Sequence, residues 1–256
     1  SLRLHAPLTS GKDVSEFAFS ADASRIVFSG AVDRASADLY SVPVDGSAAP
    51  RRLNASLTAG VGIESFLVAP ESAELVYQTS GDAFFRVPAD GSAAAEFLID
   101  LPDTSLRSGF QLSPEGEFVF YRAEALGLGI VELFALRTGG GAPVKLSGPI
   151  VAGGEVTAFV RSPDGTRVVY LADQRAEGRF ELFSAPLTAP GQPLWPAPPA
   201  GSDVTSFQID FESRFVVFLL HTGSLTAGLD ALYRVRLDAS APPELIHRPL
   251  DPDGDV

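Results

Sequence analysis

The sequence has no cysteine and no methionine, and only Lys12 and Lys145 of its 19 basic residues are lysines. Without cysteine the chain can form neither a disulfide framework nor a thiolate metal site. Its longest apolar run, residues 215–220, is far too short to span a membrane. Acidic residues outnumber basic ones by 32 to 19, and a net charge of −13 argues against nucleic acid or an anionic membrane as partner.

The composition that remains is that of a globular protein. The 256 residues are 45% hydrophobic and 20% charged, enough for one large domain or two small ones. Because no methionine opens the chain and Ser1 begins no signal peptide, we expect a segment of a longer product. The excess of arginine over lysine hints at a GC-rich bacterial genome.

Five copies of one pattern run along the chain. Each copy carries an aromatic residue in a first segment, a second one ten or eleven residues later, and a third after a further turn. A repeat at a period of 40–50 residues indicates a solenoid, a propeller or an array. The first series is Phe17, Phe66, Phe110, Phe159 and Phe207; the second is Phe28, Tyr77, Phe120, Tyr170 and Phe218; the third is Tyr40, Phe85, Phe134, Phe183 and Tyr233.

Each copy divides into four short strands, and no window has a helical apolar period. The fourth strand is short and marked by proline, which lacks a hydrogen-bond donor, so we expect it at the outer edge of its sheet. Four strands per repeat of this length predict an all-β propeller of four-stranded antiparallel blades in a single domain, 1–256. The predicted blades are 13–57, 62–101, 106–150, 155–199 and 203–250.

Burial explains why such a repeat would fold. One sheet cannot bury both faces alone, whereas blades stacked side by side enclose their aromatic and β-branched side chains between them. The fifteen aromatics are therefore expected at the junctions between blades. A pair of sandwiches is the rival all-β arrangement, but it does not predict equal spacing along the whole chain.

The two ends of the sequence resemble each other. Residues 1–14 align on residues 243–256, so both ends carry the piece that forms a fourth strand. We therefore expect 1–12 to be a spare outer strand and loop. One copy is redundant, the chain is part of a larger ring, or the spare strand is exchanged with another chain to form an oligomer.

The repeat resembles that of the TolB-like propeller family. Its best copy reads SPDGTRVVYLAD from Ser162, followed by ELFSAPL from Glu181. Ser113-Pro-Glu-Gly and Asp38-Leu-Tyr match in other copies, while Asp210-Phe-Glu lacks both the proline and the glycine. The resemblance implies a propeller whose first strands line a central channel. The repeat occurs in periplasmic TolB proteins, in peptidase-associated propellers and in some lyases, so it implies no single function.

Acidic residues at the start of the first strands are the candidate binding site. If these strands line a channel, the carboxylates gather near one mouth, where they could hold Ca²⁺ or a basic peptide segment. The alternative is that they cap backbone N–H groups of the crossing loops. The candidates are Asp13, Glu16, Glu64, Glu155, Asp203 and Asp255, with Arg107 interrupting the ring in the third copy.

The sequence gives little support for a hydrolase or a metal-dependent lyase. It contains no Gly-x-Ser-x-Gly segment, and only His5, His221 and His247 could act as bases or metal ligands. A propeller lyase would need clustered histidine ligands from several blades. We therefore predict no catalytic residue, no bound metal and no cofactor, calcium at the acidic mouth being the one exception considered.

A proline-rich stretch, Pro186 to Ala200, holds the only tryptophan, Trp195. It could bind a partner as a polyproline segment, or protect an outer edge strand against pairing with other chains. Trp195 would cover the blade edge in the second case and would be a partner contact if exposed.

These observations predict a non-catalytic, acidic scaffold that binds a protein or peptide in the periplasm or exterior of a bacterium, with a cationic segment favoured as the partner. One alternative is the gating propeller of a prolyl-oligopeptidase-like or tricorn-like peptidase whose catalytic domain lies outside this chain. A lyase is the other.

Overall fold

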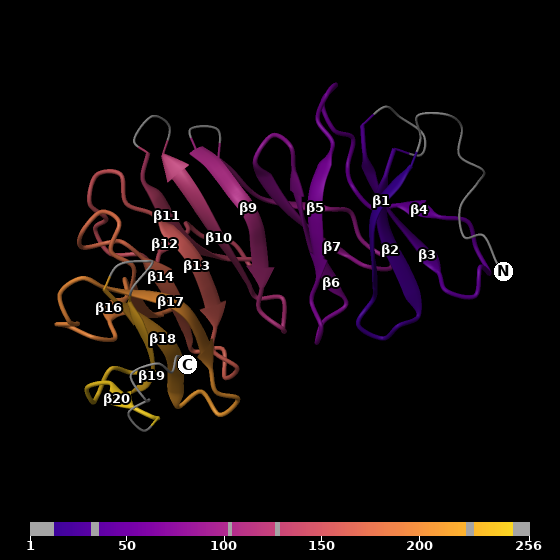
Figure 1. Cartoon of the computed structure of the whole chain (residues 1–256). Helices are drawn as coiled ribbons and strands as arrows, with labels where there is room; N and C mark the ends of the chain where they lie inside the picture. Colours follow the sequence, from indigo (N-terminus) through magenta and orange to yellow (C-terminus); the bar gives the residue numbers. More distant parts are fainter. Residues whose placement is uncertain (1–12, 32–35, 102–103, 126–128, 224–227, 248–256) are drawn as a thin grey trace. The chain divides into compact units, whose positions relative to one another are not determined.

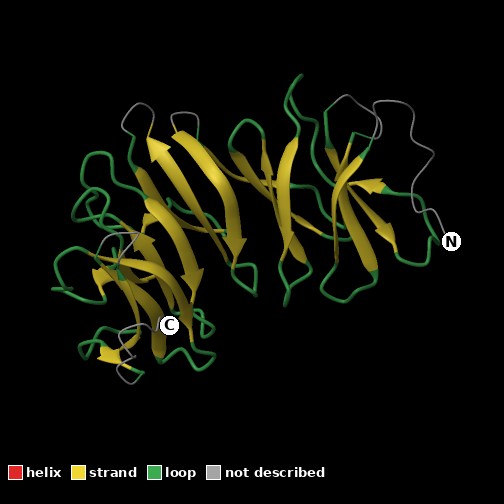
Figure 2. Cartoon of the chain, in the orientation of Figure 1, coloured by secondary structure: helices red, strands yellow, loops and turns green. Residues whose placement is uncertain are grey.

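The computed structural model describes residues 13–31, 36–101, 104–125, 129–223 and 228–247. Within these ranges the chain forms twenty strands and no helix, as predicted (Figures 1 and 2). No helix there could span a membrane. Asp255 and His5 lie outside the described residues, as do 1–12, the predicted spare strand and its loop.

The strands form five four-stranded antiparallel sheets, each from consecutive strands. The first sheet contains β1 (Val14–Phe19), β2 (Arg25–Gly30), β3 (Asp38–Pro43) and β4 (Arg51–Arg52). The second contains β5 (Ile63–Val68), β6 (Glu74–Thr79), β7 (Ala83–Pro88) and β8 (Glu96–Asp100). The third contains β9 (Thr104–Leu112), β10 (Phe118–Ala125), β11 (Val131–Arg137) and β12 (Val144–Lys145). The fourth contains β13 (Val156–Arg161), β14 (Arg167–Ala172), β15 (Glu181–Pro186) and β16 (Gln192–Pro193). The fifth contains β17 (Ser202–Ile209), β18 (Phe215–Thr222), β19 (Leu229–Arg236) and β20 (Glu244–Leu245).

The chain divides into two compact units, and the division passes through the third sheet. One unit comprises residues 1–120 and 136–142, and the other comprises 121–135 and 143–256. In every sheet the fourth strand lies at one edge and the first at the other, so the fourth strand is an edge strand, and its place on the outside of a ring stays a prediction.

The three aromatic series form one row across each sheet. In the fourth sheet Phe159 stands opposite Tyr170, which stands opposite Phe183. The second and third members of a row stack with ring centroids 5.1–5.7 Å apart, as Tyr170 and Phe183 do at 5.1 Å. Since directly opposed residues share one face of an antiparallel pair, the repeat spacing itself produces the row.

Two details of this prediction are wrong. In the third sheet Tyr121, and not Phe120, stacks on Phe134, while Phe120 packs at 6.1 Å from Phe118 on the alternate face. Successive side chains of a strand point to opposite faces, so the shift of one residue changes the face. In the first sheet Phe17 is 69% exposed, because no described residue packs over the edge strand β1 at that point.

The interiors lie between neighbouring sheets of the same unit. In the first unit Val27 and Leu39 of the first sheet pack against Phe66 and Tyr77 of the second. In the other unit Leu182 and Leu194 of the fourth sheet pack against Phe218 of the fifth. Within each unit, a face of one sheet is thus buried against aromatic residues of its neighbour, as the stacking argument requires.

Candidate functional site

A bulge in the first strand places the acidic side chain of Glu64. In four sheets the pairing of the first strand with the second slips by one residue near its start. The extra residue is Ser15, Thr157 or Thr205 in three of them and Glu64 in the second sheet. Bulges redirect a side chain and terminate regular pairing. The pattern of apolar residues in the sequence gives no sign of this bulge.

Glu64 lines a surface cavity of about 330 Å³ in the first unit. The carboxylate of Asp82 lines the same cavity and accepts a hydrogen bond of 3.5 Å from the side-chain amide of Gln78. Asp82 has a positive φ of 59°, which Asp tolerates better than most residues. No basic residue occurs among the described residues that line the cavity; the others are Ser65, Ser80, Leu106 and Gly109.

Glu16 lies on β1, next to β5, the strand that carries Glu64. Partial burial raises the pKa of the Glu16 carboxyl, and the hydrogen bond donated by the Phe66 N–H offsets part of this rise. Glu16 therefore links two neighbouring first strands. Asp13 precedes β1 and is exposed. The structure thus brings Glu16 and Glu64 onto adjacent strands, with Asp82 as the acid that sequence analysis missed.

The two candidates in the other unit differ in their contacts. Asp203, at the start of β17, accepts a 2.8 Å hydrogen bond from the Phe180 N–H. Glu155, before β13, is exposed, and its N–H donates to Asp173. The Asp203 carboxylate thus binds a backbone N–H of the connection between β14 and β15, and its role in binding a partner stays a prediction. Among the described residues, no three His, Asp or Glu side chains gather as metal ligands would.

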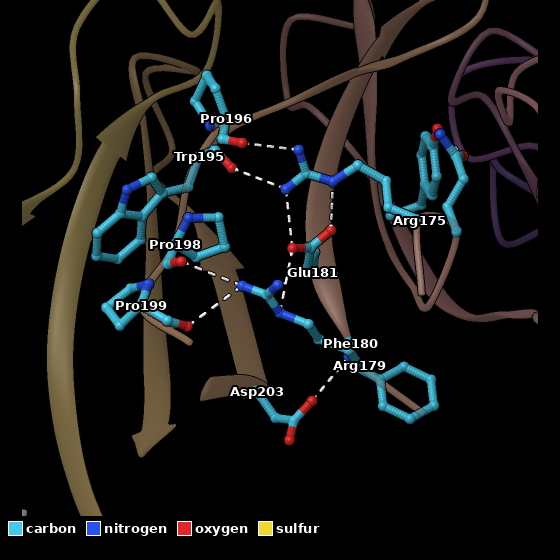
Figure 3. A network of polar contacts seen from close by, with 11 residues as sticks. Arg175, Arg179, Phe180, Glu181, Trp195, Pro196, Pro198, Pro199 and Asp203 are labelled. Carbon is cyan, nitrogen blue, oxygen red and sulfur yellow. Dashed lines mark hydrogen bonds and ion pairs between the residues drawn. The ribbon is translucent and has the colours of Figure 1, made fainter. Parts of the chain in front are cut away.

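The proline-rich stretch is held by a buried acid and two arginines (Figure 3). Glu181 begins β15 and is 5% exposed; its carboxylate accepts two hydrogen bonds from Arg175, at 2.6 and 2.8 Å. The Arg179 guanidinium lies 3.5 Å from the same carboxylate. Arg175 also donates to the carbonyls of Trp195 and Pro196, and Arg179 donates to those of Pro198 and Pro199.

Trp195 is partly buried by this arrangement. Its ring lies 5.2 Å from that of Tyr233 and 6.4 Å from that of Phe218, both of the fifth sheet. A void of only about 20 Å³ remains beside it. The tryptophan thus follows the edge strand β16 of the fourth sheet and packs against the fifth. Its role as a partner contact stays a prediction.

The histidines do not form a shared site among the described residues. His221 pairs with Asp230 at 2.8 Å across β18 and β19. His247 lies just after β20, an edge strand of the same sheet. Each of the two described histidines thus lies on a strand of the fifth sheet or just after one.

No protein-family model and no curated protein matches the sequence. Among solved structures, dipeptidyl peptidase 4 of Porphyromonas gingivalis is 12% identical, with a TM-score of 0.63 over 86% of this chain and 36% of that one. A puromycin-hydrolyzing peptidase of Mycobacterium tuberculosis is 17% identical, with a TM-score of 0.51 over 97% of this chain and 40% of that one. A TolB candidate from Agrobacterium tumefaciens is 11% identical, with a TM-score of 0.47 over 91% of this chain and 80% of that one.

The likeness to the two peptidase structures supports the predicted propeller in fold alone. The chain spans well under half the length of either peptidase. The neighbours and the five four-stranded sheets agree with a propeller scaffold, whereas the number of blades in a complete ring stays a prediction.

Proposed function

We propose that this chain is a propeller scaffold of the bacterial envelope or exterior that binds a cationic segment of a protein or peptide. The observation that carries the proposal is the pair of carboxylates, Glu64 and Asp82, in one cavity of the first unit. A lysine or arginine side chain entering the cavity would pair with the two carboxylates and offset one of their two negative charges. The net charge of −13 would raise the rate at which a cationic partner is encountered.

The neighbouring Glu16 would strengthen this preference. Its pKa is raised because the carboxyl is partly removed from water. An approaching cation would stabilise the ionised form and so lower that pKa again. The scaffold requires no conformational change for this, since β1 and β5 are already fixed by their sheets. Asp13, Glu155, Asp203 and Asp255 would extend the acidic surface if the first strands of all blades converge. The proposal assigns no reaction to the chain.

A labelled, end-blocked peptide of alternating lysine and proline tests the proposal. Such a peptide is cationic but cannot add to a sheet as a regular strand. We expect saturable, salt-sensitive binding that is about tenfold weaker in the variant Glu64→Gln/Asp82→Asn. The control Glu115→Gln/Glu117→Gln removes the same charge from an exposed hairpin and should change binding little. Equal affinities of the two variants would refute a site at the cavity. Competition by calcium, but not by magnesium, would show that the acids hold Ca²⁺ as well.

The accessory propeller of a peptidase is a second candidate function. It is favoured by the match to dipeptidyl peptidase 4, in which 86% of this chain aligns with only 36% of a longer one. A Gly-x-Ser-x-Gly segment encoded beyond these residues, with peptidase activity in the complete product, would support it. If the complete reading frame contains no such segment, the scaffold without a peptidase domain is the better candidate.

A further inference from the structure

The outer strand β8 of the second sheet differs from the other four outer strands. It pairs with β7 over five residues, whereas β4, β12, β16 and β20 each contain two. β8 is the last strand of its sheet, so its outer side faces no other described strand. An edge strand presents a row of backbone groups that another chain can pair with.

The sequence explains why only β8 continues. By pairing register, Ala95 occupies the position that Pro50, Pro143 and Pro243 occupy immediately before the short outer strands. Beyond the second residue, polar side chains end the pairing in the first and third sheets. The Asn54 amide oxygen accepts the Leu39 N–H at 2.8 Å, and the Ser147 hydroxyl accepts the Leu133 N–H at 3.2 Å.

In the second sheet the position equivalent to Asn54 and Ser147 holds an apolar residue, Ile99. Phe84 pairs with Ile99 through the backbone, after a slip of one residue at Leu98. Ile99 has no side-chain acceptor with which to replace the backbone bond, so β8 runs on to Asp100. β8 has neither feature that protects the other edges, namely a proline at the strand and an end after two residues.

The exposed side chains of β8 define what could pair with it. Phe97 is 59% exposed and rests edge-on against Phe85, with ring centroids 5.5 Å apart. Glu96 pairs with Arg86 at 2.6 Å but is largely exposed, and Asp100 is exposed with no polar partner among the described residues. The strand therefore offers apolar surface between two acidic ends.

This charge pattern disfavours a second copy of the chain as the occupant. Antiparallel pairing of all five residues with another β8 would place Glu96 opposite Asp100 twice, and like charges in opposed positions destabilise a pair. The net charge of −13 adds general repulsion between copies. A strand with apolar residues between two basic ones has the complementary pattern.

We infer that β8 is a docking edge to which an extended peptide, apolar in its centre and basic at both ends, adds as a fifth antiparallel strand. Backbone hydrogen bonds to β8 would provide the affinity, and the side chains opposite Phe97, Glu96 and Asp100 would provide the selectivity. This site is separate from the cavity of Glu64 and Asp82, and neither proposal requires the other.

The test uses a labelled, end-blocked heptapeptide, Thr-Lys-Val-Thr-Val-Lys-Thr, with fluorescence anisotropy as the readout. Its control has proline in place of the central threonine and so cannot continue the ladder. We expect saturable binding of the first peptide and about tenfold weaker binding of the second. Phe97→Ser should weaken the first complex about tenfold, while Leu245→Ser, at the equivalent place on β20, should not.

A charge reversal guards against a variant that merely misfolds. Asp100→Lys should weaken binding of the lysine peptide and strengthen binding of its glutamate counterpart. An excess of the unlabelled lysine–proline peptide, which cannot add as a strand, should not displace the heptapeptide from β8, which separates this site from the acidic cavity. Equal affinity for the threonine and proline peptides would overturn the inference, as would unchanged binding in Phe97→Ser. A dimer in sedimentation experiments that is lost in Phe97→Ser would overturn it too, since the edge would then serve a second copy.

Discussion

The outer edges of the fourth and second sheets are built from the same repeat and end differently. At the fourth, β16 stops after Gln192 and Pro193, and the chain beyond it is held by Arg175 and Arg179 around the buried Glu181. At the second, β8 continues for five residues with no such cover among the described residues. The comparison teaches that edge protection in this chain depends on a few local residues and not on the repeat as a whole.

The largest expected effect is at the protected edge. Glu181→Ala leaves two arginines without their shared, buried carboxylate, and we expect the free energy of unfolding to fall by about 2–4 kcal/mol, less than for a fully buried pair because both arginines are partly exposed. Because Trp195 is the only tryptophan, its emission should shift to the red in urea titrations at lower denaturant. The exposed pair Arg234–Glu244 provides the control, since Glu244→Ala should cost less than about 1 kcal/mol. Equal losses would mean that the network of Glu181 does not secure the edge.

A smaller loss of stability is expected where the side-chain amide of Asn54 ends the pairing of β4 with β3. Asn54 is buried, accepts the Leu39 N–H and donates to Asp38 at 2.8 Å. Asn54→Ala removes these partners, so unfolding should become easier by about 2 kcal/mol. Amide exchange at Leu39 should accelerate at the same time. Unchanged exchange there would contradict the view that this side chain replaces the backbone bond.

The converse substitution should shorten the open edge. In Ile99→Asn the second sheet gains the kind of side chain that ends the first sheet's outer strand, at the cost of some apolar burial, about 1 kcal/mol. We expect the backbone pairs of β7 with Ile99 and Asp100 to be lost, together with heptapeptide binding. NMR contacts between the strands would measure this. Persistence of both pairs would show that the side chain at position 99 does not determine strand length.

The smallest effect at neutral pH is expected at the buried tyrosines of the second and fourth sheets. Burial raises the pKa of Tyr77 to about 12, and that of Tyr170 is also raised by burial, although its hydroxyl donates to Gln174 at 2.9 Å. A raised folded-state pKa contributes stability that is complete below the unfolded value of about 10 and is lost as the pH rises through about 12. Tyr77→Phe should therefore match the parent at pH 7 and resist alkali better, by at most about 1.4 kcal/mol per pH unit. Parallel alkaline unfolding curves for parent and variant would show that Tyr77 does not ionise in this range.

The sequence predicted the fold well because the signal is repeated. Five copies of three aromatic positions fix the strands, and the register then places Phe159, Tyr170 and Phe183 in one row. The face was ambiguous only where two aromatics are adjacent, as with Phe120 and Tyr121, since alternation alone cannot tell which of them points to the row.

The candidate site was less predictable for a physical reason. A bulge such as that at Glu64 depends on hydrogen-bond registration with β6, which leaves no mark in the pattern of apolar residues. Asp82 joins Glu64 from a different strand connection. The network of Glu181 was hidden likewise, because Arg175 and Arg179 bind backbone carbonyls, which every sequence possesses.

Amide hydrogen exchange with and without the heptapeptide tests the central claim most directly, namely that one outer edge of this chain is open to a partner strand while the others are closed. We expect added protection at residues 96–100 and none at 51–52, 144–145, 192–193 or 244–245. Protection at those short strands, or none at β8 under saturating peptide, would contradict the account.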